Sequence, residues 1–139
     1  MKRSAASLRF FGEALEPDEI TRLLGKPPSG SHRKGEVFGP RKNRVARQGS
    51  WRLAAIDREP GDLDSQVEEI LGSVTSDLSI WRRIGEMSAI DLFCGVWLDG
   101  SCEEFYLAPT TLMKLGERGI WLTLDTYADV DETEKGNVE

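Results

Sequence analysis

Polar and apolar residues alternate along residues 88–98, SAIDLFCGVWL, in the pattern of a long central β-strand. Side chains of a strand point alternately to its two faces, so every second residue belongs to the same row. The mainly apolar row consists of Ser88, Ile90, Leu92, Cys94, Val96 and Leu98. The opposite row carries a carboxylate and two large aromatic rings, those of Asp91, Phe93 and Trp97. The first row predicts a face packed against a core, and what the second row contacts is the functional question.

Similar alternation predicts the other strands. It covers residues 5–12, 49–56 and 120–125, with a short strand around 43–46. The Asp99-Gly100 pair is a strong signal for a two-residue hairpin turn. It predicts that residues 103–107 return as a strand antiparallel to the central one.

Four segments have the spacing of amphipathic helices. The first begins at Pro17 and ends before Gly25, because proline suits the first turn of a helix and glycine suits its C-terminal cap. The other three cover residues 63–71, about 77–84 and 109–115. Asp62 or Asp64 is expected to cap the second helix.

Strands and helices in this order predict a two-layer α+β domain, in which a mainly antiparallel sheet has helices on one face. A ferredoxin-like arrangement is the first expectation. The domain is expected over residues 1–128, which is enough chain for one core. Residues 129–139 are acidic and poor in apolar side chains, so they are predicted to form a flexible tail.

Cationic residues concentrate in the middle of a chain whose net charge is −6. Residues 26–52 hold eight Lys or Arg and one Glu, and residues 29–50 have the composition of a largely exposed loop. Within this segment a histidine and two cations precede a glycine, which lets backbone approach an anion. The candidate ligand-binding residues are His32, Arg33, Lys34 and Arg52. Alternatively, the basic segment only neutralises an acidic domain.

The predicted strands bring aromatic and charged side chains together on the sheet face away from the helices. This face is expected to hold Arg9, Phe11, Arg52, Asp91, Phe93, Trp97, Tyr106, Trp121, Thr123 and Asp125. Rings interleaved with charges are typical of a recognition surface, and such a patch exceeds what soluble monomers usually leave exposed. Two alternatives stay open, because the basic loop could fold over this face or two copies of the chain could pack through it.

Few residues of this chain suit catalysis or metal binding. One histidine and two cysteines cannot supply the four ligands of a structural zinc site, and Cys94 is most simply a buried apolar side chain. Asp91 and Asp125 could form a carboxylate pair if their strands are adjacent, but an ion pair with Arg9 or Arg52 explains them equally well. No cofactor and no metal are predicted, and catalysis is the less favoured class.

Composition also bears on location and partners. No apolar run approaches the roughly 20 residues of a membrane-spanning helix. Arg9 interrupts the apolar pieces of the N-terminal segment, which argues against a secretory signal, so a cytoplasmic protein is expected. The basic segment favours nucleic-acid binding, whereas the acidic body and the lack of an aromatic-rich RNA-binding signature argue against it. The expected partner is another protein or a second copy of the chain.

Several short motifs, in their order and spacing, resemble one bacterial family. They are Leu8-Arg9-Phe10-Phe11-Gly12, Pro17-Asp18-Glu19-Ile20, Leu23-Leu24-Gly25, Ser31-His32-Arg33-Lys34-Gly35-Glu36, Gly49-Ser50-Trp51-Arg52-Leu53 and Asp91-Leu92-Phe93-Cys94-Gly95, followed by the closing segment Leu112 to Tyr127. Together they resemble domain of unknown function 4279, over about residues 7–127. The resemblance implies a small stand-alone bacterial protein, and it carries over no activity, cofactor or catalytic residue.

Two functional hypotheses follow from the sequence. The first is a non-catalytic binding or protein-interaction domain that uses the aromatic and charged sheet face together with the basic loop. One version of it is an immunity-type protein that binds and blocks a toxin. The alternative is a protein that binds an anion or a phosphate ligand, or a small enzyme, through the basic loop.

Overall fold

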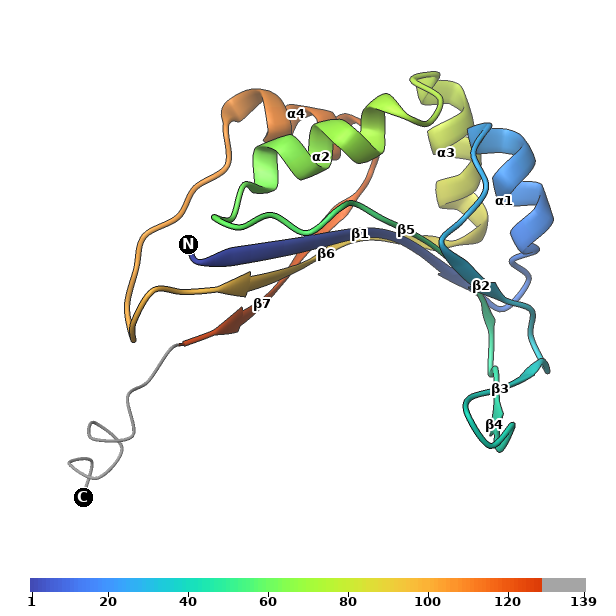
Figure 1. Cartoon of the computed structure of the whole chain (residues 1–139). Helices are drawn as coiled ribbons and strands as arrows, with labels where there is room; N and C mark the ends of the chain where they lie inside the picture. The colour runs from blue at the N-terminus through green and yellow to red at the C-terminus, as the bar shows by residue number, and fades with distance from the viewer. Residues whose placement is uncertain (129–139) are drawn as a thin grey trace.

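The computed structural model describes residues 1–128 and shows a layer of helices on one face of a curved sheet (Figure 1). The elements in chain order are β1 (Arg3–Gly12), α1 (Pro17–Leu24), β2 (Gly30–His32), β3 (Val37–Phe38), β4 (Arg44–Val45), β5 (Gly49–Ala54), α2 (Leu63–Gly72), α3 (Leu78–Met87), β6 (Ala89–Trp97), α4 (Pro109–Glu117) and β7 (Trp121–Tyr127). The predicted α+β class with a mainly antiparallel sheet is confirmed. The acidic residues 129–139, predicted as a flexible tail, lie outside the described residues.

The strand order of the main sheet is β2-β5-β1-β6-β7. The long strand β1 lies in the middle and pairs antiparallel with both β5 and β6, whereas β6 and β7 run parallel. In a ferredoxin-like sheet each β-α-β unit is split by another strand. Here α4 joins two strands that are direct neighbours, β6 and β7, so the order differs from the ferredoxin-like expectation. Strands β3 and β4 form a separate small sheet.

The predicted hairpin after the central strand does not form. Residues 103–107 are not a strand, because β1 and β7 already occupy the two edges of β6. The chain continues from β6 beside β7, where the Leu98 N–H donates to the Tyr127 carbonyl at 2.9 Å, and then crosses to α4. Phe105 and Leu107 are partly buried against the core from this loop. Their alternation with polar residues therefore reflects loop packing, not a strand.

The core lies between the helices and the inner face of the sheet. Phe10 of β1 contacts the Trp51 ring edge-on with ring centres 5.3 Å apart, and it stacks on Trp81 of α3 at 5.9 Å. Each indole N–H has a partner, since Trp51 donates to the Thr21 hydroxyl and Trp81 to the Thr75 carbonyl. Buried tryptophans need such partners; the Trp51 bond ties α1 to β5, and the Phe10–Trp81 contact holds α3 against β1.

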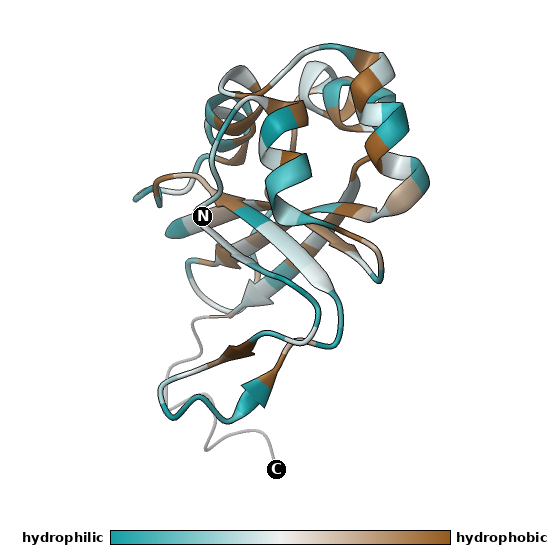
Figure 2. Cartoon of the chain, turned by 90° about the vertical axis from the view of Figure 1, so that its right-hand side faces the viewer, coloured by the Kyte–Doolittle hydropathy of each residue, from teal (hydrophilic) through white to brown (hydrophobic). Residues whose placement is uncertain are grey.

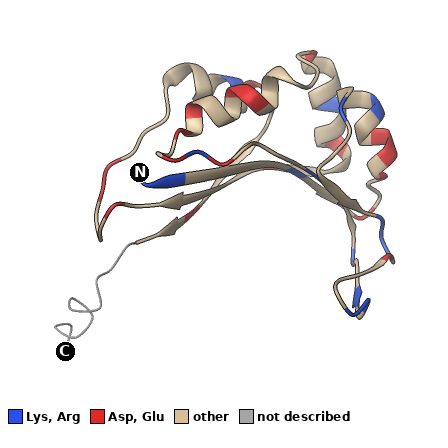
Figure 3. Ribbon diagram, in the orientation of Figure 1, with Lys and Arg blue, Asp and Glu red and all other residues tan. Residues whose placement is uncertain are grey.

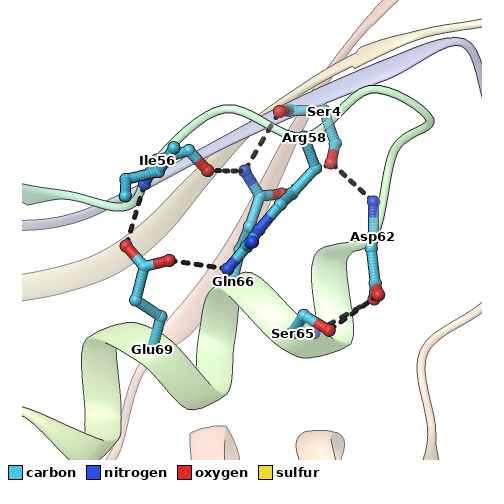
Figure 4. A network of polar contacts seen from close by, with 7 residues as sticks. All are labelled: Ser4, Ile56, Arg58, Asp62, Ser65, Gln66 and Glu69. Carbon is cyan, nitrogen blue, oxygen red and sulfur yellow. Dashed lines mark hydrogen bonds and ion pairs between the residues drawn. The ribbon is translucent and has the colours of Figure 1, made fainter.

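A buried polar network fastens α2 to the first strand (Figure 4). The Gln66 side chain accepts a hydrogen bond from the Ser4 hydroxyl at 2.6 Å, and its amide donates to the carbonyls of Ser4 and Ile56 at 3.0 Å each. Asp62 caps the helix by accepting from the Ser65 N–H, as expected. The Glu69 carboxylate also accepts from the Ile56 N–H. The segment between β5 and α2 is therefore held both by these side chains and by an isolated backbone bridge between Ser4 and Arg58.

Candidate functional site: the open sheet face and the basic arm

The face of the sheet opposite the helices has no helix over it among residues 1–128 (Figure 1). We call this surface the open face. Its aromatic, charged and hydroxyl-bearing side chains include Arg3, Arg9 and Phe11 of β1, Arg52 of β5, Asp91, Phe93 and Trp97 of β6, and Trp121, Thr123, Asp125 and Tyr127 of β7. Their shared orientation follows from strand register, because residues directly opposite each other in neighbouring strands lie on the same face.

An ion pair at the centre of the open face joins β1 to β6. The Arg9 guanidinium donates to both oxygens of Asp91, at 2.8 and 2.6 Å, and the Thr123 hydroxyl donates to the same carboxylate at 2.8 Å. The guanidinium also lies over two rings, 4.4 Å from the centre of Phe93 and 5.0 Å from that of Phe11. Bidentate and stacked contacts of this kind fix the arginine in place. The site is therefore built before any ligand binds.

A second cluster occupies the end of the open face near the N-terminus. The Trp97 ring stacks on Tyr127 with ring centres 5.0 Å apart and an angle of 14°, and the Arg3 guanidinium lies 4.3 Å from the Trp97 ring centre. Gly95 leaves room for this indole, which an added Cβ would meet at 2.9 Å. The Tyr127 hydroxyl donates to Asp125 at 2.7 Å, and this hydrogen bond, with the carboxylate charge, raises the pKa of the phenol.

The structure separates the two carboxylates that could have formed a pair. Strands β6 and β7 are neighbours, but Asp125 lies opposite Gly95, four residues along the strand from Asp91. Asp91 is the partner of Arg9, and Asp125 is the partner of Tyr127. Tyr106, expected on the open face, instead lies exposed in the loop before α4, since residues 103–107 are not a strand.

A basic hairpin projects from the sheet on the side of the open face (Figure 2). We call residues 33–48, which contain β3 and β4, the basic arm. Its base is held by backbone hydrogen bonds, from the Gly35 N–H to the Ala46 carbonyl and from the Ala46 N–H to the Glu36 carbonyl, at 2.8 Å each. Figure 3 shows Lys and Arg along the arm, while most of the Asp and Glu lie on the helices and the other loops.

The four predicted ligand-binding residues are not brought together. Arg33 and Lys34 form ion pairs with Asp18 and Glu13 on and before α1. His32 and Arg52 do line a common cavity on the open face, where the Arg52 guanidinium lies close above Gly30. The Nδ1 atom of His32 is 2.8 Å from the Glu36 carboxylate. Arg33 and Lys34 thus point toward α1 and the segment before it, whereas His32 lines the cavity.

The basic arm and the sheet enclose a cleft that sequence reasoning did not identify. We call it the arm cleft. It consists of a cavity of about 680 Å³ and an adjoining one of about 220 Å³, which share Phe11, His32 and Ser50 in their walls. Phe38 of the arm packs on His32 with ring centres 4.3 Å apart. The only sequence signal for this cleft was the high density of cations between residues 41 and 47.

Cations around the arm cleft lack internal partners. Arg44 and Arg47 line the larger cavity, and Arg52 lines the smaller one. Within residues 1–128, no carboxylate pairs with Arg41, Lys42, Arg44, Arg47 or Arg52. By contrast, Arg9, Arg33 and Lys34 are each already paired. The cleft is therefore a region of positive charge that is free to attract an anion.

Three further observations on the described residues concern metal ions, membranes and the Cys94 thiol. No group of three or more His, Cys, Asp or Glu side chains among residues 1–128 is placed to hold a metal ion. No helix in that range has the length and apolar character needed to cross a membrane. Cys94 is fully buried, and burial raises the pKa of its thiol to about 12.

Comparison with known proteins identifies the family. The family model described as Domain of unknown function (DUF4279) matches residues 2–129, nearly the whole chain. The chain therefore belongs to this family, which confirms the resemblance seen in its motifs. No curated protein and no solved structure matches the chain.

Proposed function

We propose that this member of the DUF4279 family is a non-catalytic binding domain of the bacterial cytoplasm, whose open face and arm cleft receive an acidic segment of a partner protein. The observation that carries the proposal is the set of unpaired cations at the arm cleft, next to the aromatic rings of Phe11 and Phe38. A carboxylate from a partner can bind these cations without breaking an existing ion pair. The rings supply the contact area that interfaces gain from aromatic side chains.

The arrangement of the polar groups supports binding instead of catalysis. A general base needs an accessible lone pair, but the Asp91 carboxylate already accepts three hydrogen bonds. The thiol of Cys94 is buried as well. Rigid side chains that are held before binding also reduce the entropy lost on association. An immunity-type protein that covers a toxin is one form of such a domain.

Affinity capture tests this proposal. Tagged wild-type protein is compared with Arg44→Glu/Arg47→Glu, which reverses charge in the arm cleft, and with Phe93→Ala/Trp97→Ala on the open face. The control is Arg82→Glu/Arg83→Glu, which makes the same charge change on the exposed side of α3. A polypeptide retained by wild type and by the control but lost from both test variants supports the proposal. The captured protein is then titrated in purified form, and its affinity should fall steeply with added salt.

Equal capture by wild type and by Arg44→Glu/Arg47→Glu would overturn the assignment of the arm cleft. Circular dichroism of each variant shows whether loss of capture reflects loss of fold. A partner lost equally from the α3 control would mean that overall charge, and not the cleft, governs the interaction.

A small anionic ligand is the second candidate, favoured by the size of the arm cleft. Ligand pockets usually measure about 300–1,000 Å³, and the larger cavity measures about 680 Å³. A phosphate group could bind Arg52 and His32 at the narrow end while apolar atoms contact Phe11. Inorganic phosphate titrated into the purified protein, with Arg52→Ala as the comparison, would separate this candidate from a protein partner.

A further inference from the structure

Strand β7 forms one edge of the main sheet and has no strand on its outer side within residues 1–128. The Tyr127 carbonyl accepts from the Leu98 N–H, so the backbone groups of Tyr127 point toward β6. Because strand residues alternate in this respect, Leu122, Leu124 and Thr126 direct their N–H and C=O groups outward. These groups form a row of donors and acceptors that another strand can pair with.

The two edges of the sheet differ in how they are protected. The opposite edge strand, β2, has three residues, follows Pro27-Pro28 and precedes Arg33-Lys34, which are features that discourage strand addition. Strand β7 has seven residues in unbroken register with β6, no proline or lysine, and a single charge at Asp125. It also exposes three large side chains: Trp121 is 79% exposed, Leu124 43% and Tyr127 45%.

We propose that β7 pairs antiparallel with β7 of a second copy of this chain, around a twofold axis at Leu124. This register overlaps the whole strand. Leu122 then lies opposite Thr126 and Leu124 opposite its own symmetry mate, and each of these pairs exchanges two backbone hydrogen bonds because their groups point outward. The β7 edges of the two copies thus satisfy each other's donors and acceptors, as an interface between identical subunits requires.

The side chains match in the same register. Trp121 lies opposite Tyr127 of the second copy, so the exposed indole joins the aromatic row that Tyr127 and Trp97 already form. Leu124 meets Leu124 on the helix side of the sheet. Asp125 lies opposite Thr123, and no like charges face each other even though each copy carries a net charge of −6. The charges of the strand are therefore compatible with a second copy.

Side chains of α4 also fit the proposed pairing of the two β7 strands. On α4, Lys114 turns toward α2 and forms an ion pair with Glu68. Helical spacing puts Leu112 on the side of α4 that faces away from Lys114 and α2, and it is 50% exposed. In the dimer, Leu112 of each copy lies near the paired Leu124 side chains and covers them. The arm clefts lie at the far edges, so both stay open to partners.

A register-specific disulfide tests the proposal. In a Cys102→Ser background, Thr123→Cys/Asp125→Cys should form a covalent dimer on mild oxidation, because these positions oppose each other and non-hydrogen-bonded pairs bring side chains close. The single variants Thr123→Cys and Asp125→Cys should stay monomeric on non-reducing gels, since neither position opposes itself. Cross-linking by the single variants to the same extent would overturn the register.

Sedimentation equilibrium tests the dimer without any cysteine. Wild type should have twice the monomer mass at concentrations of tens of micromolar, and Leu124→Lys should lose the dimer while keeping its circular dichroism spectrum. Ile56→Lys is the control, because Ile56 is an exposed apolar side chain near β5, away from the β7 edge. A wild-type protein that sediments as a monomer across this range would overturn the proposal, as would a dimer that Leu124→Lys leaves intact.

Discussion

The two cysteines of this chain differ in reactivity because they differ in burial. Cys94 lies on β6 and faces the hydrophobic core. Its burial, together with the charge of Asp91, raises the pKa of its thiol to about 12. Cys102 lies exposed in the loop after β6. We expect a thiol reagent at pH 8 to modify Cys102 alone in the native protein, since the thiolate is the reactive form. Titration with and without denaturant checks this, and two fast thiols in the native state would contradict it.

Gln66 should be among the most sensitive single residues for stability. Replacing it with leucine keeps the volume but removes the acceptor of the buried Ser4 hydroxyl and the donor to the Ile56 carbonyl, while the Ser4 carbonyl keeps the Arg58 N–H. Buried groups that lose a hydrogen bond cost about 1–3 kcal/mol each, so we expect Gln66→Leu to lower the free energy of unfolding by about 2–4 kcal/mol. Urea denaturation measures this, with the exposed Gln48→Leu as the control. A loss below about 1 kcal/mol would mean that the network contributes little.

At the scale of a single helix, the N-cap of α2 makes a pH-dependent contribution to the free energy of unfolding. The hydroxyl and backbone N–H of Ser65 donate to Asp62 and lower the pKa of its carboxyl below its ordinary value. A lowered pKa in the folded state means that the stabilisation is present above about pH 4 and is lost as the pH falls through the folded pKa. The ionised cap therefore stabilises the protein near neutrality.

Asp62→Ala should consequently lower the free energy of unfolding by about 1 kcal/mol at pH 7. The difference from wild type should be smaller at pH 3, because protons begin to neutralise the wild-type carboxyl as the pH falls toward its folded pKa. Urea denaturation at both pH values checks this, with Glu86→Ala on the exposed side of α3 as the control. A difference that stays constant with pH would show that the charge of the cap is irrelevant.

Secondary structure was predictable wherever its signals are local. The proline start and glycine end of α1 and the alternation in β1 and β6 involve residues adjacent in sequence, and all three elements are present. Residues 103–107 show the same alternation but form a loop, because both edges of β6 are occupied by distant strands. Pattern alone could not reveal this competition for the edges.

The open face was more predictable than the arm cleft for a similar reason. Strand alternation fixes which face Arg9 and Asp91 occupy, and the register then brings them into contact. By contrast, the partners of Arg33 and Lys34 lie on another element, and the walls of the cleft come from the arm and three strands. Such contacts depend on the path of the whole chain.

At the scale of the whole molecule, the basic arm is structurally separate from the core. It buries Ala46 at its base and half-buries Phe38, and every other core residue belongs to the body. Its cations have no role in holding the described fold together, apart from the surface ion pairs of Arg33 and Lys34. Surface pairs contribute little to stability. The arm should therefore be dispensable for folding.

Shortening the arm tests this separation of fold and function. Residues 36–45 are replaced by Asn-Gly, a two-residue turn that can join Gly35 to Ala46 where the backbone is already paired. We expect the free energy of unfolding to change by less than about 1 kcal/mol, because surface segments of this kind bury little apolar area. Capture of the partner should be lost, since the walls of the arm cleft formed by Phe38 and Arg44 are removed. A shortened protein that unfolds would identify the arm as a structural cover of the open face, whereas one that still binds the partner would move the interaction to the sheet alone.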